Sequence, residues 1–280
     1  MKSEIVVVGA NSQLGKALKK IRPNWVYLDR HDLDLTNLKS IAWAFETQPA
    51  VIINFAAFTA VDDAEKSRAE AELLNAAAVG ELAKCCGTLI QISTDYVFSG
   101  DKKAPYLETD STGPLNYYGQ SKLLGEKAAF QNNKNSVVIR TSWVYSAFNK
   151  NFVKRMIELA ATRDQLKVVD DQIGTPTNAS DLVAMVAHIA EAPAQFRGEV
   201  FHYSNMGQCS WYELTKEILH LTKSKTPLTP IKTSEYPLPA VRPHYSVLDK
   251  TKISKVSGLS IPTWQASLEK FIQEYLVSLK

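Results

Sequence analysis

Cysteine is scarce in this 280-residue sequence, and the positions of the three that occur exclude the usual uses of clustered cysteines. Cys85 and Cys86 are neighbours, and Cys209 stands alone. A disulfide framework needs several cysteines that can pair, and a metal site needs several ligands at short, regular spacing. The histidines form no motif either. We therefore expect no disulfide framework and no metal site, and a reducing cytoplasm as the compartment.

Long apolar runs and blocks of like charge are also missing. No run approaches the roughly 20 apolar residues that a membrane-spanning helix needs. Residues 1–4 lead directly into a short apolar run, so we expect no signal peptide. The net charge is only +3, and the basic residues are spread along the chain. We therefore expect no membrane partner and no nucleic-acid partner.

The chain does contain a regular alternation of apolar runs and helical patterns. Short apolar runs occur at residues 5–8, 25–28, 51–54, 89–92 and 137–140. Amphipathic or helix-forming stretches lie between them, including one expected over residues 70–86. This alternation predicts an α/β protein with a Rossmann-like, doubly wound parallel sheet.

The alternation becomes irregular after about residue 148, and the segment 226–244 carries many prolines. We predict a dinucleotide-binding domain over residues 1–148. Residues 149–280 are expected to form mainly a smaller substrate-binding lobe, interleaved with the main sheet rather than joined to it by a linker.

A glycine turn follows the first predicted strand. Its sequence is Gly9-Ala10-Asn11-Ser12-Gln13-Leu14-Gly15, and a helical stretch begins within it. Gly9 would allow a tight turn, Gly15 would allow close packing of helix on strand, and amides at the helix start would hold a pyrophosphate. Ser12 replaces the middle glycine of the usual pattern. A purely structural turn between strand and helix is an equally weighted alternative.

The second predicted strand ends in an acidic residue beside a basic one. Asp29 lies at the distance from the glycine turn at which a carboxylate commonly binds the ribose hydroxyls of NAD. Arg30 could meet a 2′-phosphate instead, so the choice between NADH and NADPH stays open. Asp34 could reach the adenine edge, or it could cap the helix that is expected from about Asn37, which is the commoner role.

A tyrosine and a lysine four residues apart open a predicted long helix. Residues i and i+4 share a helix face, so Tyr118 and Lys122 can meet at one point. A neighbouring cation favours the phenolate and lowers the pKa of a phenol, which would make Tyr118 a proton donor near neutral pH. Thr94, at the end of the fourth predicted strand, could supply a third hydroxyl. About one such Tyr/Lys pair is expected by chance in a chain of this composition.

Several stretches, taken in order, resemble one family. They are residues 9–15, 60–62, 93–98, 114–122, 140–145 and 171–177, and Arg242-Pro243. Together they are similar to the dTDP-4-dehydrorhamnose reductases, which belong to the extended short-chain dehydrogenase/reductase superfamily. The Ser-Thr-Asp-Tyr-Val-Phe and Thr-Ser-Trp-Val-Tyr runs are specific to this branch, whereas the Tyr/Lys pair is general to the superfamily. The resemblance covers nearly the whole chain.

The resemblance implies reduction by NADPH or NADH of the 4-keto group of a nucleotide-linked deoxysugar, with dTDP-4-dehydro-L-rhamnose as substrate. It implies Tyr118 as proton donor, Lys122 as the residue that holds the nicotinamide ribose, and Thr94 as the hydroxyl on the carbonyl. The cofactor-binding residues that we expect are Gly9, Asn11, Ser12, Gln13, Leu14, Gly15, Asp29, Arg30, Asp34, Leu35, Ala56, Ala57, Thr59, Asn75, Tyr118 and Lys122. Those expected for the substrate are Thr94, Asp95, Tyr96, Val97, Trp143 and Arg242. For Trp143 and Arg242, simple packing roles compete with substrate contact.

Some family features are absent. Phe58 stands where many relatives carry histidine. Some members dimerise through a magnesium ion held by glutamates, but residues 16–20 contain no acid, and the second matching position is near Ser180. We therefore expect no metal, and either a monomer or a homodimer.

Two other functions fit the same fold. A sugar-nucleotide dehydratase would carry an acid directly after the Asp that follows Thr94, but Tyr96 occupies that place. A non-catalytic, dinucleotide-binding regulatory subunit, such as the β subunit of methionine adenosyltransferase, is the alternative from another class. The intact Thr94, Tyr118, Lys122 and Trp143 favour an enzyme.

Overall fold

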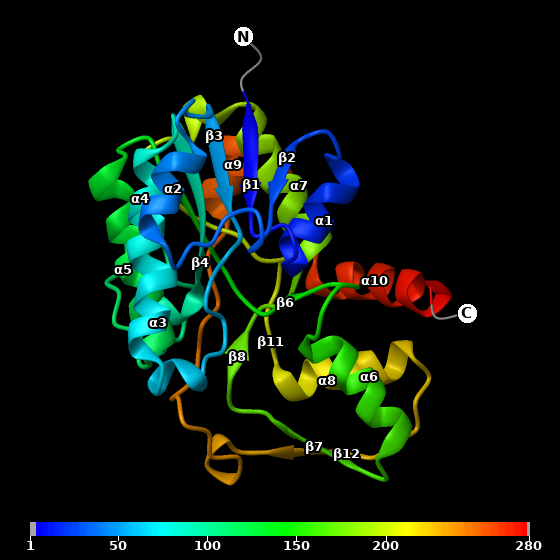
Figure 1. Cartoon of the computed structure of the whole chain (residues 1–280). Coiled ribbons are helices and arrows are strands. Elements are labelled where there is room, and N and C mark those ends of the chain that lie inside the picture. Colours follow the sequence, from blue (N-terminus) through cyan, green and yellow to red (C-terminus); the bar gives the residue numbers. More distant parts are fainter. Residues whose placement is uncertain (1–3, 279–280) are drawn as a thin grey trace.

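The computed structural model describes residues 4–278, and a six-stranded sheet lies at its centre (Figure 1). The strands are β1 (Ile5–Val8), β2 (Val26–Leu28), β3 (Val51–Asn54), β4 (Thr88–Thr94), β5 (Val137–Thr141) and β10 (Val200–His202). Their order is β10-β5-β4-β3-β1-β2, and every neighbouring pair is parallel. The order reverses between β1 and β3, which is where open α/β sheets leave a crevice for ligands.

The sheet is buried on both faces, as its uninterrupted apolar strands predict. Successive side chains of a strand point to opposite faces. In β1, Val7 accordingly packs in one apolar cluster, while Val6 and Val8 pack in another. This alternation explains why the sequence shows a continuous apolar run rather than an alternating one.

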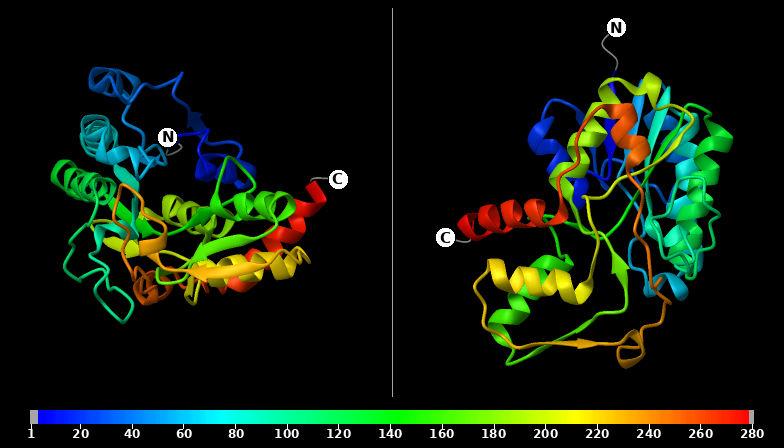
Figure 2. Two further views of the ribbon diagram at one scale, coloured as in Figure 1. Left: turned by 90° about the horizontal axis from the view of Figure 1, so that it is seen from below. Right: turned by 180° about the vertical axis from the view of Figure 1, so that it is seen from behind.

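Helices cover both faces of the sheet (Figure 2). Those of the first face are α1 (Gln13–Ile21), α7 (Ala179–Glu191) and α9 (Thr251–Ser257), which contribute Leu18, Val183 and Ile253 to one cluster. Those of the second face are α2 (Leu38–Ala44), α4 (Ala78–Lys84) and α5 (Tyr117–Asn132), which contribute Ile41, Leu82 and Ala129 to the other. The chain after residue 148 therefore returns to the main sheet with α7, β10 and α9. The strand β10 was not predicted from sequence, because three residues give too short a pattern.

The remaining elements form a smaller lobe below the carboxyl ends of the strands (Figure 1). Its elements are α6 (Phe152–Thr162), β7 (Leu166–Val169), α8 (Trp211–Leu221), β12 (Leu228–Ile231) and α10 (Trp264–Ser278). The strands β7 and β12 pair in parallel. The lobe has an apolar core of its own, which includes Val153, Leu214 and Phe271. Two short ribbons connect it to the sheet: β6 (Val144–Tyr145) with β9 (Thr177–Asn178), and β8 (Ile173–Gly174) with β11 (Cys209–Ser210).

The helix expected over residues 70–86 contains a π-helical turn. The segment consists of α3 (Arg68–Glu72), the π-turn η2 (Leu73–Ala77) and α4. Such turns are rare and commonly lie at functional sites. Here the turn carries Asn75, whose side chain is buried between η2, α5 and the loop after β3.

Candidate active site

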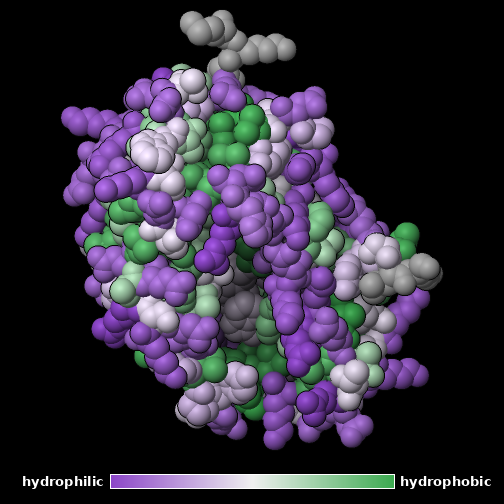
Figure 3. All heavy atoms as spheres, in the orientation of Figure 1, coloured by the Kyte–Doolittle hydropathy of each residue, from purple (hydrophilic) through white to green (hydrophobic). Residues whose placement is uncertain are grey.

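A cavity of about 990 Å³ opens at the carboxyl ends of the parallel strands. It runs from the turn after β1, past the end of β4, to aromatic residues of the smaller lobe. Figure 3 shows the face of the molecule that is hollowed here, between the sheet and the smaller lobe, with hydrophilic side chains along the rim. The predicted dinucleotide turn and the predicted catalytic residues thus line one continuous space.

The glycine turn forms one end of this cavity. Gly9 has a φ of +86°, and a Cβ there would come within 2.6 Å of the Ala56 backbone nitrogen, so only glycine fits this turn. Ser12 is the N-cap of α1, and its hydroxyl accepts a hydrogen bond from the Gly15 amide at 3.0 Å. The first turn of α1 contains no acidic residue. These features suit a phosphate group at the helix N-terminus.

Nine of the predicted cofactor residues outside the catalytic pair line the cavity between the turn and residue 35. The turn contributes Gly9, Asn11, Ser12, Gln13 and Leu14, and the region after β2 contributes Asp29, Arg30, Asp34 and Leu35. Gly15 is not among the lining residues: it is buried where α1 passes the backbone of Gly9 and Ala10. It supports the turn from behind.

Asp29 is held in place by its own loop. Its carboxylate accepts hydrogen bonds from the Asn11 side chain at 2.8 Å and from the His31 amide at 2.7 Å. The His31 amide contributes most to lowering the pKa of Asp29. Arg30 and His31 also line the cavity. A carboxylate and a guanidinium therefore stand at the same rim, the first suited to ribose hydroxyls and the second to a 2′-phosphate.

The segment after β3 is shaped by Asn75. Ala56, Ala57 and Thr59 line the cavity, whereas Asn75 lies behind them and is 1% exposed. The Asn75 side chain accepts from the Phe58 amide at 2.9 Å and donates to the Phe58 carbonyl at 3.0 Å. It also donates to the Ser121 hydroxyl at 2.9 Å, which joins this segment to α5. The geometry makes Asn75 a support of the cavity wall rather than part of its surface.

Thr94, Tyr118 and Lys122 meet at the end of β4. The helix α5 begins at Asn116, whose side chain accepts from the Gly119 amide at 2.8 Å. This cap places Tyr118 in the first turn, beside the Thr94 hydroxyl. The Lys122 Nζ donates to the Ile92 carbonyl oxygen at 2.6 Å. All three side chains line the cavity.

The expected lowering of the Tyr118 pKa is not what the structure shows. Burial penalises the phenolate and raises the pKa of Tyr118 to about 12, while the Thr94 hydroxyl acts in the opposite direction. Burial also lowers the pKa of Lys122 to about 8. The lysine head points to a backbone carbonyl, so its charge does not overcome the desolvation of the phenol. In this structure Tyr118 is a neutral hydroxyl that can donate a proton.

Asp95 is the other ionisable group close to Thr94. It is buried, and burial raises its pKa to about 7. Thr94 donates to one carboxyl oxygen at 3.1 Å, and the other oxygen has no hydrogen-bond partner among the described residues. Asp95 and Tyr96 both line the cavity. Val97, in contrast, points into an apolar cluster with Phe98 and Tyr106 and does not reach the cavity.

Aromatic rings form the far end of the cavity. Trp143 lines it and stacks on Trp211 of α8, with Phe152 tilted against Trp211 at 4.5 Å. Trp143 has a φ of +48°, a strained conformation for a bulky residue. Trp211 and Phe152 were not predicted from sequence, because nothing local to α6 or α8 shows that these helices face the end of β5.

The segment 146–151 crosses the glycine turn and was also missed. Ser146 donates to the Gln13 side-chain oxygen at 2.8 Å, and Asn149 donates to the Asn11 carbonyl at 3.0 Å. Asn149 and Lys150 line the cavity. The asparagines around Lys150 give a weak sequence signal for a loop, but not for its contact with the turn.

Comparisons with known proteins identify the family of this chain. The family model described as the RmlD substrate binding domain matches residues 1–277. A dTDP-4-dehydrorhamnose reductase of Sinorhizobium fredii is 39% identical over 99% of this chain and 99% of its own length. This chain belongs to the dTDP-4-dehydrorhamnose reductase family.

Solved structures of this reductase family have the same fold. The enzyme from Clostridium acetobutylicum has a TM-score of 0.93 and 38% identity, covering 98% of this chain and 99% of its own. The enzyme from Bacillus anthracis, solved in complex with NADP, has a TM-score of 0.92 and 36% identity, covering 98% and 100%. The predicted fold class and family are thereby confirmed.

One substrate residue that the reductase family implies lies outside the cavity. Arg242 forms a two-pronged ion pair with Asp62, with its Nη2 at 2.6 Å from a carboxylate oxygen. Asp62 also accepts from the Ala240 amide at 3.1 Å. The pair lowers the pKa of Asp62 and joins the loop after β3 to the proline-rich segment. Arg242 is not among the lining residues.

No group of three or more His, Cys, Asp or Glu side chains within residues 4–278 is arranged to hold a metal ion. No helix in the same range is long and apolar enough to cross a membrane.

Proposed function

We propose that this chain reduces the 4-keto group of dTDP-4-dehydro-L-rhamnose to dTDP-L-rhamnose, with NADPH or NADH as the hydride source. The observation that carries the proposal is the single cavity that Gly9, Thr94, Tyr118 and Lys122 share. A redox reaction of this kind needs a dinucleotide site and a proton donor in contact, and the family relationship supplies the substrate class.

The residues present suit a dinucleotide. The positive φ of Gly9 brings the turn close to the Ala56 backbone, and the start of α1 presents amides without a competing acid. Asp29 and Arg30 would meet the adenosine ribose and its 2′-phosphate. A reduced nicotinamide supplies a hydride when bound; the chain's own residues must orient it and deliver the proton.

The catalytic step would use two hydroxyl groups and one ammonium group. Thr94 and Tyr118 would donate hydrogen bonds to the sugar 4-keto oxygen and polarise the carbonyl. As the hydride adds to the carbonyl carbon, Tyr118 would give its proton to the oxygen, so that the product is an alcohol. Lys122 would hold a ribose hydroxyl and stabilise the phenolate that remains on Tyr118. General acid assistance of this kind contributes about 10²–10⁴-fold to the rate.

We also propose a cytoplasmic location and a monomer or homodimer. All three cysteines are free, buried thiols, which suits a reducing compartment. Light scattering of the purified chain, with and without cofactor, would measure the assembly.

The deciding experiment follows NADPH and NADH oxidation against nucleotide-linked 4-keto sugars. The dTDP-linked 4-keto sugar is generated in situ by its upstream enzymes, and a UDP-linked 4-keto sugar serves as the matched comparison. The product is identified by NMR of the isolated nucleotide sugar. Oxidation that depends on the dTDP-linked ketone, with a reduced C4 in the product, supports the proposal. A chain that oxidises neither cofactor but retains a stoichiometric protein partner would instead be a regulatory subunit.

A further inference from the structure

A buried ion pair lies next to the catalytic residues and takes no part in the reaction as described above. Glu126 of α5 and Arg140 of β5 form two hydrogen bonds, at 2.9 and 2.7 Å, and both side chains are only 5% exposed. The Ser93 hydroxyl donates to the same Glu126 carboxylate at 2.5 Å. A helix and two adjacent strands are therefore joined by one carboxylate.

The position of this carboxylate relates it directly to the catalytic lysine. Glu126 follows Lys122 by four residues, so both project from the same face of α5. Lys122 binds the Ile92 carbonyl, and Glu126 binds the side chain of the next residue, Ser93. Thr94 comes next on the same strand. Two consecutive residues of β4 thus hold two consecutive turns of α5, just before the strand reaches the active site.

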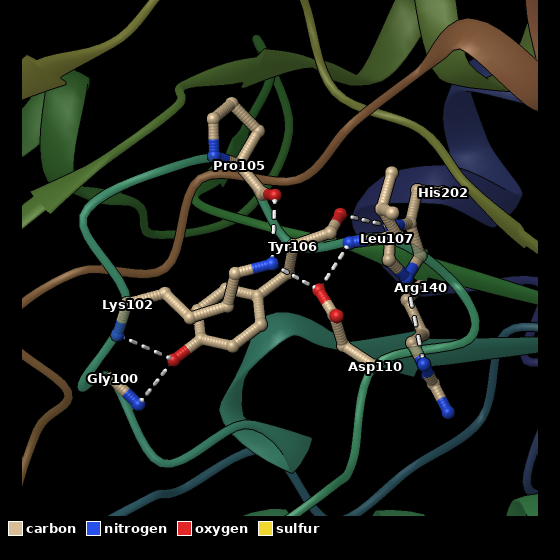
Figure 4. Close-up of polar contacts among 8 residues, drawn as sticks. All are labelled: Gly100, Lys102, Pro105, Tyr106, Leu107, Asp110, Arg140 and His202. Carbon is tan, nitrogen blue, oxygen red and sulfur yellow. Dashed lines mark hydrogen bonds and ion pairs between the residues drawn. The ribbon is translucent and has the colours of Figure 1, made fainter.

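A neutral histidine, His202, lies against Arg140 on the side away from Glu126. The Arg140 guanidinium lies 3.5 Å from the His202 ring and 5.0 Å from the centre of the Phe98 ring. Figure 4 shows Arg140 beside His202, with the Tyr106 loop on the other side of the histidine. The His202 ring nitrogen Nδ1 lies 3.1 Å from the Tyr106 carbonyl oxygen. Burial lowers the pKa of His202 to about 3, so the ring adds no charge near neutral pH.

Stability alone is a weak reason for such a pair. Desolvation of two buried charges offsets much of their attraction, and apolar residues of similar volume commonly replace them without loss. A charged residue one helical turn from Lys122 therefore points to a role in the site.

We propose that Glu126 is a positioning residue for proton transfer at Tyr118: anchored by Ser93 and Arg140, it fixes α5 on the end of β4 and keeps Lys122 in its charged form. The proposal deepens the proposed function and rests on it for the identity of the reaction.

The charge balance around Lys122 agrees with this role. Burial lowers the pKa of Lys122, and the negative charge of Glu126 acts against that lowering. The strand β4 and the π-turn η2, which pack against α5, contain no ionisable side chain. The other charged groups near this end of the helix are Asp95 from the 3₁₀ turn after β4, whose pKa is raised to about 7, and Arg140 from β5.

Three acids on the remaining neighbours of α5 have partners of their own, and the other two, Asp63 and Glu70, are exposed. Glu72 of α3 accepts from the Tyr117 hydroxyl at 2.8 Å. Glu65, in the 3₁₀ turn at residues 63–65, accepts from the Tyr117 amide at 2.8 Å. Glu81 of α4 pairs with Lys84. Glu126 is the acid whose charge acts on Lys122.

The test separates charge from position with three variants. Glu126→Leu/Arg140→Met removes both charges while keeping apolar volume, so that no unpaired charge is left buried. Glu126→Asp keeps the charge but shortens the side chain. Glu81→Gln, which removes an acid from the surface of α4, is the matched control. Circular dichroism and melting curves establish which variants fold, and kcat, KM and the pH profile are then measured.

For the folded double variant we expect kcat to fall about 10-fold or more with little change in KM for the sugar. We also expect the alkaline limb of the pH profile to move to lower pH by about one unit, because Lys122 loses its proton more easily without a nearby negative charge. Glu126→Asp should lower kcat and keep the alkaline limb, and Glu81→Gln should match the wild type. A folded double variant with wild-type kcat and an unmoved limb would show that the pair is structural only, and would overturn the proposal.

Two further outcomes also decide the question. If the double variant does not fold, Glu126→Asp decides: an unchanged kcat overturns the proposal, and a lowered kcat with an unmoved limb supports it. If the wild type reduces none of the sugars, the proposed function fails, and NADPH binding is titrated against pH by fluorescence instead. NADPH binding that is lost at a lower pH in the double variant than in the wild type still supports the role of Glu126. Identical binding curves against pH for the two proteins overturn it.

Discussion

The indole rings of Trp143 and Trp211 stack with their centroids 3.5 Å apart and their planes inclined by 10°. Trp143 lies between β5 and β6, and Trp211 begins α8 of the smaller lobe. Gly174 of β8 faces the Trp143 indole, because a Cβ at position 174 would lie 2.6 Å from a carbon of that ring. The Trp143 ring is thus held between a glycine and a second aromatic ring, at the end of the cavity where we propose that the sugar nucleotide binds.

The first prediction tests this arrangement through Gly174→Ala. The added methyl group should displace the Trp143 ring and disturb its stacking, so KM for the sugar nucleotide should rise roughly 3–10-fold, the value of one aromatic contact. The change should also weaken the near-ultraviolet circular dichroism of the paired indoles. Gly113→Ala is the matched control, since a Cβ there meets only Ser99 at an ordinary 3.6 Å. Unchanged KM and circular dichroism in Gly174→Ala would contradict the arrangement.

The second prediction concerns the proton donor. Tyr118→Phe removes the hydroxyl beside Thr94, so turnover should fall by about 10²-fold or more, while the dissociation constant of NADPH changes little. Tyr117→Phe is the control, because the Tyr117 hydroxyl binds Glu72 on the outside of α3. Absorbance measurements of NADPH oxidation after rapid mixing give the turnover of the wild type and of each variant. Near wild-type turnover in Tyr118→Phe would remove this residue from the mechanism.

The third prediction addresses the choice of cofactor. We expect both cofactors to work, and Arg30→Ala to weaken NADPH binding about 10-fold or more, because a charge-assisted hydrogen bond to the 2′-phosphate is lost. NADH binding should stay within about two-fold. Fluorescence titration measures both, and Arg155→Ala, a surface arginine paired with Glu158, is the control. Equal losses for the two cofactors would show that Arg30 does not contact the 2′-phosphate.

The fourth prediction is a dependence of stability on pH. Burial lowers the pKa of His202 to about 3, against an ordinary value of 6.5. Between these values the unfolded chain binds a proton that the folded chain does not, so stability falls on acidification, by roughly 1.4 kcal/mol per pH unit from this group. The loss begins below pH 6.5 and ends near pH 3.

Urea unfolding of the cofactor-free protein across this range measures the effect. His202→Gln should flatten the pH dependence of the unfolding free energy, while His31→Gln, at an exposed site, should retain the wild-type slope. Identical slopes in wild type and His202→Gln would mean that the pKa of His202 is the same in the folded and the unfolded chain.

The amino-acid sequence by itself determined the features that depend on local pattern. Continuous apolar runs predicted the parallel strands, the glycine turn predicted the start of α1, and the i,i+4 spacing placed Tyr118 and Lys122 on one face of α5. Each of these follows from the periodicity of a single element or from the conformation of a single residue. The boundaries of these elements differ from the prediction by only a few residues.

Only the tertiary structure decided which side chains meet across elements and how deeply they are buried. It placed Asn75 behind the cavity wall, paired Arg242 with Asp62, brought Trp211 against Trp143 and added β10 to the sheet. It also reversed the expected shift of the Tyr118 pKa, because the desolvation of a phenol depends on everything packed around it. Contacts between distant segments and the local dielectric arise from the packing of the whole chain, and no local pattern records them.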